Sequence, residues 1–264
     1  MNSLLSLLQP YPFERLKQLF AEVTLPANYS AISLGMGEPR HPTPQFIKDT
    51  LCSHLEGLAS YPATAGDIRL RTAFTEWIQR RYQLDLNPAT QVLPINGSRE
   101  ALFAFAQTVI DAAQPEPMVV CPNPFYQIYE GATLLAGAKP YYAPSDPARN
   151  FAVDWDSVPL DVWQRTQLIF VCSPGNPTGA VMPLNEWHKL FALSDRYGFV
   201  IASDECYSEI YFRDEPPLGG LEAAKKLGRH DFKNLISFTS LSKRSNVPGL
   251  RSGFVAGDAA LIKN

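Results

Sequence analysis

Apolar residues recur along the chain in two patterns, and each pattern predicts one kind of element. Leu70, Phe74, Trp77 and Ile78 fall on one face of a helix, so residues 67–82 are predicted to form an amphipathic helix. The same spacing predicts a second helix, carried by Trp187, Leu190, Phe191 and Ser194. A third helix is predicted over residues 101–112.

Seven short apolar runs lie between the helical segments. They are continuous rather than alternating and rich in β-branched or aromatic residues, which is typical of strands buried on both faces of a mostly parallel sheet. The fold class is therefore predicted to be α/β, with three α/β/α layers around a mostly parallel seven-stranded sheet. The runs cover residues 91–95, 118–121, 139–143, 168–172, 199–202, 235–238 and 252–256.

The first part of the chain differs from the rest in composition. Prolines are frequent up to Pro44, so residues 1–43 are predicted to form an N-terminal arm together with part of a small domain. Residues 44–264 are predicted to form a large ligand-binding domain, incomplete at its C-terminal end.

Composition and charge exclude several classes of protein. With 45 % apolar and 19 % charged residues, the 264-residue chain is globular in composition, and its net charge of −3 gives no field that would hold nucleic acid or an anionic membrane. No apolar run approaches the about 18 residues of a membrane span, and no targeting segment is recognised. Four cysteines without a CxxC pair indicate a reduced, cytoplasmic setting, and four histidines without HExxH spacing give no metal prediction.

The residues that follow each predicted strand carry the candidate chemistry, because ligands of such sheets bind beyond the carboxyl ends of the strands. Ser98 follows the first run and opens a helix, either as part of an anion site or as an ordinary N-cap. Tyr126 follows the second run, where it either stacks on a flat ligand or packs in the core. Asn176 lies in a Pro/Gly-rich turn after the fourth run and can donate a hydrogen bond.

Two further strand ends supply charges. Asp204 follows the fifth run, either buried beside a cation or exposed as an N-cap. Lys243 follows the sixth run among hydroxyl groups, with Arg251 eight positions later, which suits a site that holds a phosphate and a Schiff base together. Taken together, the five strand ends predict a pocket for a phosphorylated aromatic aldehyde.

Three motifs, in this order and spacing, resemble the class I/II aminotransferases, which are pyridoxal-phosphate enzymes of fold type I. They are SPGNPTG (173–179), SDECY (203–207) and SLSKxxxxxGxR (240–251). Further segments, including LQPYPFERL and CPNPFYQIYEGA, are similar to bacterial N-succinyldiaminopimelate aminotransferases of lysine biosynthesis. The resemblance implies transfer of an amino group between glutamate/2-oxoglutarate and an amino-keto diacid.

The resemblance also implies a role for each motif residue toward pyridoxal 5′-phosphate. Lys243 would bind the cofactor covalently and move the substrate proton, and Asp204 would keep the ring nitrogen protonated. Tyr207 and Asn176 would hydrogen-bond the ring 3-oxygen, and Tyr126 would stack on the ring. The other implied contacts are to the phosphate, from Ser98, Arg99, Ser240, Arg251 and the neighbouring subunit's Tyr61, and to the substrate, from Gly37 and Asn176.

The resemblance has two departures and leaves alternatives open. Ser252 stands where the family usually has a hydrophobic residue, and the chain ends at Asn264, whereas relatives continue into a C-terminal small domain. We therefore expect a fragment that transaminates poorly, works on small amino and 2-oxo acids, and belongs to a homodimer. A β-eliminating lyase or a cofactor-binding module without turnover would share the same motifs. Arg40 and His41 are candidates for dicarboxylate recognition or merely part of a solvated loop.

Overall fold

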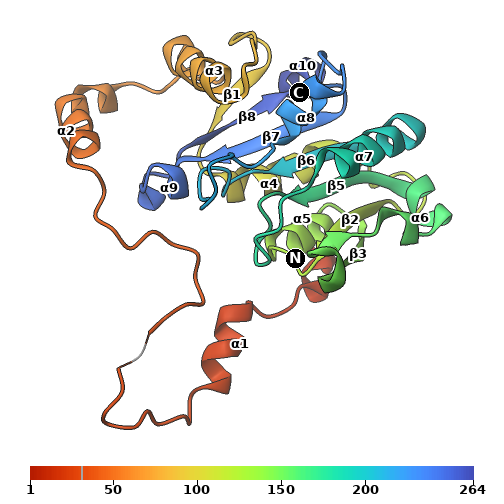
Figure 1. Ribbon diagram of the computed structural model, residues 1–264, viewed down its shortest axis with the longest axis horizontal. Coiled ribbons are helices and arrows are strands. Elements are labelled where there is room, and N and C mark those ends of the chain that lie inside the picture. Colours follow the sequence, from red (N-terminus) through yellow and green to blue (C-terminus); the bar gives the residue numbers. More distant parts are fainter. Residues whose placement is uncertain (31) are drawn as a thin grey trace.

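A sheet of eight strands runs through the centre of the structure, a computed structural model that describes residues 1–30 and 32–264 (Figure 1). The strands lie in the order β1-β8-β7-β6-β5-β2-β3-β4. Their bounds are β1 (Val92–Ile95), β2 (Met118–Asn123), β3 (Lys139–Asp146), β4 (Ala152–Val153), β5 (Thr166–Cys172), β6 (Val200–Asp204), β7 (Leu235–Ser240) and β8 (Gly253–Gly257).

Strand direction decides which loops meet at one edge. Strands β3, β2, β5, β6 and β7 are parallel to one another, whereas β8 is antiparallel to both β7 and β1. Strand β1 therefore points the same way as β7. As a result, the carboxyl ends of β1, β2, β5, β6 and β7 share one edge of the sheet.

The predicted α/β fold is confirmed, with one strand more than predicted. All seven apolar runs form strands at the expected places, within a few residues of their predicted bounds. The additional strand β4 has only two residues and pairs antiparallel with the end of β3. Such a short strand has no apolar run of its own, so the sequence pattern contains no signal for it.

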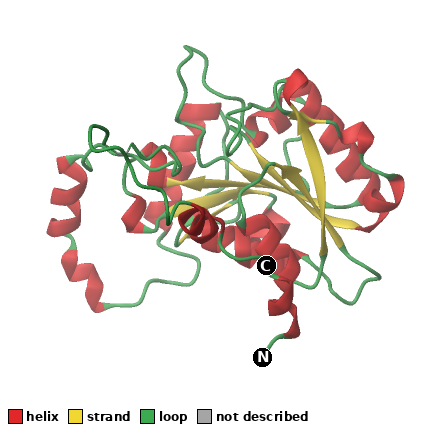
Figure 2. Cartoon of the chain, turned by 90° about the horizontal axis from the view of Figure 1, so that it is seen from below, coloured by secondary structure: helices red, strands yellow, loops and turns green. Residues whose placement is uncertain are grey.

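Helices cover both faces of the sheet (Figure 2). The predicted helices correspond to α3, α4 and α7, although α4 begins and ends three residues earlier than expected. The α-helices are α1 (Pro12–Leu19), α2 (Gln45–Ser53), α3 (Ile68–Tyr82), α4 (Ser98–Val109), α5 (Ile128–Leu135), α6 (Leu160–Arg165), α7 (Leu184–Tyr197), α8 (Gly220–Lys226), α9 (Leu241–Arg244) and α10 (Ala259–Lys263). Short 3₁₀ helices are η1 (Ser3–Leu7), η2 (Leu55–Ala59), η3 (Pro147–Arg149), η4 (Trp155–Ser157) and η5 (Pro248–Leu250).

The central strands are buried on both faces because successive side chains point to opposite sides. In β6, Ile201 packs in the cluster under α3, α6, α7 and α8, whereas Ala202 packs in the cluster under α4 and α5. Phe170 and Val171 divide in the same way in β5. This two-sided burial explains why the strands appear in the sequence as continuous apolar runs, and it produces the predicted three layers.

Helix α7 shows how the apolar stripe anchors a helix on the sheet. Trp187, Leu190, Phe191 and Ser194 are buried, as their spacing predicts. The Ser194 hydroxyl donates to the Phe199 carbonyl at 2.6 Å, which satisfies a buried polar group. Burial of one such apolar side chain contributes about 1.5–3 kcal/mol to folding.

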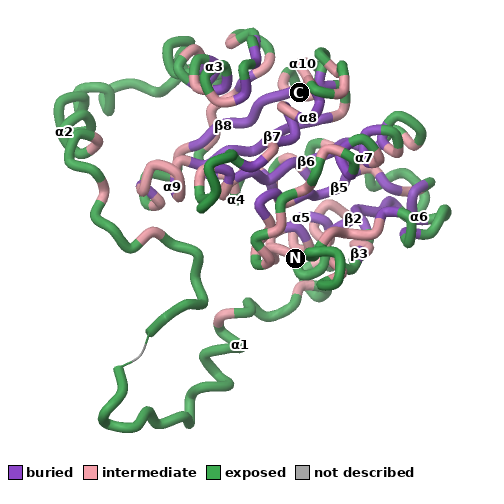
Figure 3. Tube along the Cα trace, in the orientation of Figure 1, coloured by how far each residue is buried: buried purple, intermediate pink, exposed green. Residues whose placement is uncertain are grey.

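Much of the N-terminal region, including α1 and α2, lies outside the packed body, whereas η1 contacts α5 (Figures 1 and 3). None of η1, α1, α2 and η2 contains a buried residue, and many large apolar side chains in them are exposed. The division into an arm over 1–43 and a large domain over 44–264 stays a prediction. Across residues 1–30 and 32–264, no helix has the length and apolar character needed to cross a membrane.

Candidate active site

The predicted acid is at the shared edge of the sheet. Asp204 is the last residue of β6 and is 4 % exposed, so the alternative of a surface N-cap is wrong. Its Oδ2 accepts a hydrogen bond from the Tyr129 hydroxyl at 2.7 Å, and its Oδ1 accepts from the Cys206 backbone N–H at 3.3 Å. Within residues 1–30 and 32–264, neutral hydrogen-bond donors from Tyr129 and Cys206 thus contact this buried carboxylate.

The pKa values of Tyr129 and Cys206 respond to burial and to the neighbouring acid. Burial raises the pKa of both groups well above their usual range, and the nearby Asp204 carboxylate raises it further. Both side chains therefore stay neutral around the carboxylate at neutral pH. Tyr129 lies in α5 and also stacks on Phe170, with ring centroids 4.5 Å apart, so its hydroxyl is held in place by packing.

Lys243 lies one strand away from Asp204. In the β6/β7 register Asp204 pairs with Phe238, and the chain continues from there into α9, which carries Lys243. The Lys243 Nζ lies 5.7 Å from the centroid of the Tyr207 ring. Burial, together with nearby Cys172 and Cys206, raises the pKa of Tyr207 to about 12. The lysine, the acid and the tyrosine thus come together, and the tyrosine keeps its proton at neutral pH.

The anion site that the sequence predicts has an arginine at its mouth. The register of β1 with β8 pairs Ile95 with Gly253, which brings Arg251 opposite the turn after β1. A Cβ added to Gly97 would lie 2.1 Å from Arg251 Nη2, and Gly97 has φ 105°, so only glycine suits this position. Arg251 Nη2 donates to Glu100 Oε2 at 2.6 Å.

The Glu100 carboxylate therefore occupies the position at which the Arg251 guanidinium can bind an anion. Burial alone would raise the pKa of Glu100, but its own backbone N–H and the Arg251 guanidinium outweigh burial and lower it. Ser98 is the first residue of α4 and not its N-cap, which is Gly97. The N-cap alternative for Ser98 is wrong, and its hydroxyl instead accepts from the Cys206 thiol at 3.0 Å.

Ser240 lies at the end of β7, beside the lysine. Its hydroxyl accepts from the Ser242 N–H at 3.1 Å and so caps α9, the short helix that carries Lys243. Ser240 is 2 % exposed. The side chain therefore fixes the start of α9, whether or not it also contacts a ligand.

The predicted aromatic side chain is half-buried and tied to the helix N-terminus. The Tyr126 hydroxyl accepts from Arg99 Nε at 2.6 Å, and the Arg99 guanidinium lies 5.6 Å from the Tyr126 ring centroid. Tyr126 also meets Tyr129 edge-on at 5.8 Å. Burial raises the pKa of Tyr126, while Arg99 opposes that change.

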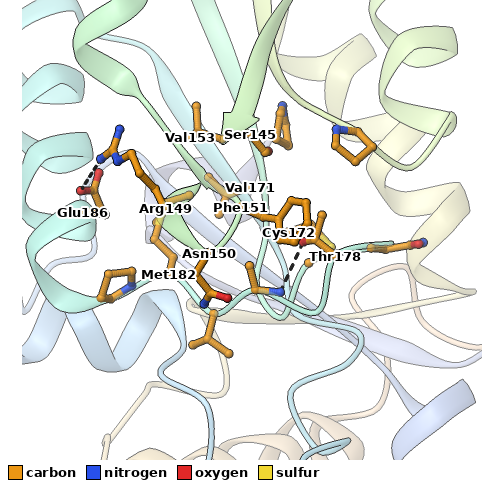
Figure 4. Close-up of a pocket in the computed structure, with 18 of the residues that line it drawn as sticks. Ser145, Arg149, Asn150, Phe151, Val153, Val171, Cys172, Thr178, Met182 and Glu186 are labelled. Carbon is orange, nitrogen blue, oxygen red and sulfur yellow. Dashed lines mark hydrogen bonds and ion pairs between the residues drawn. The ribbon is translucent and has the colours of Figure 1, made fainter. Parts of the chain in front are cut away.

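A cavity of about 300 Å³ lies beside the turn that carries Asn176 (Figure 4). Its walls are mainly apolar, and the Arg149 Nη2 and Glu186 Oε1 atoms meet at 3.5 Å on one side of it. Asn176 and Cys172 border the cavity, which therefore adjoins the acid and lysine site. No motif predicted this cavity, because its lining residues come from separate strands and loops.

Two predicted residues, Gly37 in the arm and Tyr61 beyond it, are placed differently. A Cβ added to Gly37 would lie 2.8 Å from the Tyr207 hydroxyl oxygen, so Gly37 lies against the site. Tyr61 is fully exposed and contributes nothing to the site from within its own chain. Arg40 and His41 are also exposed, and their role in dicarboxylate recognition stays a prediction.

Sequence reasoning missed several polar partners at the site. Tyr129, Glu100 and Cys206 contact the predicted residues Asp204 and Arg251 or their neighbours. The spacing of Tyr129 three residues after Tyr126 contained a signal, because residues so spaced at the start of a helix share a face. Across the described residues, 1–30 and 32–264, no three His, Cys, Asp or Glu side chains group as metal ligands would.

Comparison with known proteins agrees with this geometry. The family model "Aminotransferase class I and II" matches residues 29–264. The LL-diaminopimelate aminotransferase of Aquifex aeolicus is 35 % identical over 98 % of this chain, and that of Dehalococcoides mccartyi is 35 % identical over 97 %. The chain spans 65 % and 64 % of the length of these two relatives.

The similar solved structures are also aminotransferases. A Neisseria meningitidis aminotransferase is 54 % identical, with a TM-score of 0.96 over 100 % of this chain and 67 % of its own. The aminotransferase AspB of Helicobacter pylori is 40 % identical, with a TM-score of 0.90 over 97 % of this chain and 66 % of its own. The chain therefore belongs to the class I and II aminotransferases, a family that uses pyridoxal 5′-phosphate as its cofactor.

Proposed function

We propose that this protein is a pyridoxal-phosphate-dependent transaminase that exchanges amino groups between glutamate and an amino-keto diacid of the diaminopimelate type. The observation that carries the proposal is the meeting of Asp204, Tyr207 and Lys243 at adjacent strand ends. The names of the relatives support the substrate class, since several of them are LL-diaminopimelate aminotransferases. The N-succinyl form of the substrate is the finer part of the proposal.

The residues of the site fit the cofactor. A buried carboxylate whose partners are neutral donors has room in its hydrogen bonding for a protonated ring nitrogen, and Asp204 is such a group. At the other end, the absence of a side chain at Gly97 lets the Arg251 guanidinium lie directly against the backbone of the turn after β1. A phosphate bound there would exchange with Glu100 as the partner of Arg251 and would also meet the N-terminus of α4.

Each side chain has a separate task in the proposed reaction. When bound, the cofactor supplies an aldehyde that takes up amino groups and a ring that withdraws electrons from the substrate carbon. Asp204 holds a proton at the ring nitrogen, and Tyr207, which keeps its own proton up to about pH 12, donates a hydrogen bond to the ring 3-oxygen. Asn176 donates to the same oxygen. Lys243 would hold the cofactor covalently and, once the substrate amino group has displaced it, its free amine would move a proton at the substrate carbon.

The remaining contacts complete the proposed site. Tyr126 stacks on the ring, and Ser98, Arg99, Ser240 and Arg251 bind the phosphate. Gly37 gives room for the substrate carboxylate beside Tyr207. We propose that the protein acts in the cytoplasm as a homodimer in which Tyr61 of the partner subunit reaches the phosphate. The exposed apolar side chains of the arm support such an interface.

Visible absorption of the protein with added pyridoxal phosphate tests the proposal. We expect an absorption band from lysine-bound cofactor in the wild type and in Lys189→Ala, a control at an exposed lysine paired with Asp156. The band should be absent in Lys243→Ala. Added glutamate should then convert the cofactor to its amine form, whereas release of ammonia and pyruvate from cystine would indicate a lyase. A band that persists in Lys243→Ala would reject the proposal.

A further inference from the structure

Asn246, in the loop that joins Lys243 to Arg251, connects two distant parts of the chain through its backbone N–H, its side-chain Nδ2 and its backbone carbonyl. Its backbone N–H donates to the Lys243 carbonyl at 3.3 Å. Its side-chain Nδ2 donates to the carbonyl oxygens of His41 at 2.7 Å and Pro42 at 3.0 Å. Its own carbonyl accepts from the Thr43 hydroxyl at 2.8 Å.

This set of bonds is unusual within the arm. The residues around it, from Ile32 to Phe46, are almost all exposed, and Thr43 is one of the few that are partly buried. The three bonds from Asn246 and Thr43 join segments that are 203 to 205 residues apart. We call Asn246 and Thr43, with the His41 and Pro42 carbonyls, the arm latch.

The backbone of Asn246 favours this role. Its φ is 53°, in the left-handed region that asparagine tolerates better than most residues. In that conformation its N–H turns toward Lys243, while its side chain and carbonyl face the arm. One residue thus fixes the arm relative to the short helix that carries the lysine.

The arm segment beyond the latch reaches the site. Gly37 lies against the Tyr207 hydroxyl, and Tyr207 lies in turn against the Lys243 amine. The Glu38 N–H donates to the Met36 carbonyl at 2.9 Å, so the chain turns at this point. The latch therefore holds one end of a short segment, residues 37–43, whose other end borders the site.

We propose that Asn246 and Thr43 are positioning residues that hold the segment 37–43 as a wall of the substrate entrance. Substrate affinity then depends on the latch, although neither residue touches the reacting atoms. The effect on the substrate rests on the proposed function, whereas the latch itself does not.

Trypsin cleavage after Arg40 in the cofactor-free protein tests the latch directly. Cleavage needs the segment around Arg40 to leave its bound position. Asn246→Asp keeps the size and the tolerance for positive φ but removes the donor, and Thr43→Val removes the hydroxyl. We expect each substitution to raise the cleavage rate about tenfold. The loss of a hydrogen bond increases the population of the released segment, and trypsin cleaves only that form. Thr43→Ser, which keeps the hydroxyl, should be cleaved like the wild type.

A cleavage rate in Asn246→Asp and Thr43→Val equal to that of the wild type would overturn the proposal. Asn246→Asp could also change the conformation of the loop between Lys243 and Arg251. Thr43→Val avoids this effect, because Thr43 lies in the arm and not in that loop.

A second measurement tests the link to substrate. With bound pyridoxal phosphate, the glutamate concentration that gives half the maximal rate of cofactor conversion should rise about tenfold in Thr43→Val, while the maximal rate changes less than about twofold. A fall in the maximal rate alone would contradict a positioning role. If the wild type binds no cofactor, the proposed function fails, and the trypsin result still decides whether the latch exists.

Discussion

The sheet edge and the N-terminal arm are built on opposite principles. At the edge, Asp204 and Ser240 are almost completely buried, and their side chains accept hydrogen bonds from Tyr129 and Ser242. In the arm, apolar side chains such as Leu19 and Leu34 remain exposed. The packing of this chain therefore fixes the conformation of the edge, whereas few contacts within the chain fix the conformation of the arm.

The largest expected effect concerns the acid at the edge. Asp204→Asn keeps the size of the side chain but removes the charge that holds a proton at the ring nitrogen. We expect the transamination rate to fall about 10²- to 10³-fold, the usual loss when one preorganised electrostatic group is removed. Steady-state kinetics with saturating cofactor measure the change.

Tyr129→Phe is the matched control for the acid, because it removes only the hydrogen bond to Asp204. We expect a loss of less than about tenfold. Equal rates in Asp204→Asn and the wild type would show that the edge does not act through this charge.

Core packing gives the next largest effect. Leu190 in α7 is completely buried against the sheet. Leu190→Ala should lower the free energy of unfolding by about 2–5 kcal/mol, because both apolar burial and packing are lost. Urea unfolding followed by circular dichroism measures it, and a loss below about 1 kcal/mol would mean that this face is not a packed core.

A buried acid beside the site predicts a smaller, pH-dependent effect. Glu205 is 1 % exposed and accepts hydrogen bonds from Ser203, Gly220 and Tyr82. Burial raises its pKa above the ordinary 4.5, although these donors oppose the rise. As pH increases above 4.5, the unfolded chain therefore loses this proton before the folded protein does. Stability should fall with rising pH until the folded group also ionises.

Glu205→Gln separates this titration from the hydrogen bonds. The amide can accept from Ser203 and Gly220 and donate to Tyr82, as a protonated acid would. We expect its stability to be flatter than that of the wild type in this pH range. Glu205→Ala should cost about 1–3 kcal/mol near pH 4.5, because buried donors lose their partner, and the cost should shrink as pH rises and the wild type loses stability. Thermal unfolding at several pH values would refute this account if Gln and Glu behaved identically.

The smallest effect is expected in η2 (Leu55–Ala59), which like the arm contains no buried residue in its helical turns. Leu58 is 83 % exposed, so Leu58→Ala should change the free energy of unfolding of the isolated chain by less than about 0.5 kcal/mol. The contrast with Leu190→Ala sharpens the comparison between the two regions. If Leu58→Ala instead weakened self-association in analytical ultracentrifugation, the proposed dimer interface would include this side chain.

The same contrast explains how much could be predicted from the sequence. Continuous apolar runs located seven strands, and the residues after them supplied Asp204 and Lys243, because strand burial and the ligand-binding edge both follow from local pattern. The roles of the site residues toward the cofactor remain predictions. The two-residue strand β4 has too little pattern to be recognised.

Contacts between distant residues could not be predicted in this way. Tyr129 and Asp204 are 75 positions apart, and Asn246 and His41 are 205 apart. Periodicity assigns a residue to a face of an element but does not say which side chain of another element will meet it. The hydroxyl partner of the acid and the arm latch therefore emerged only from the folded chain.

The central claim is that Lys243 is the residue that holds the cofactor opposite Asp204. Borohydride reduction of the protein incubated with pyridoxal phosphate, followed by proteolysis and mass spectrometry of the peptides, tests it most directly. We predict that the cofactor mass is found on the peptide containing Lys243 and is displaced when glutamate is added before reduction. Labelling chiefly at another lysine, or equal labelling of many lysines, would contradict the claim.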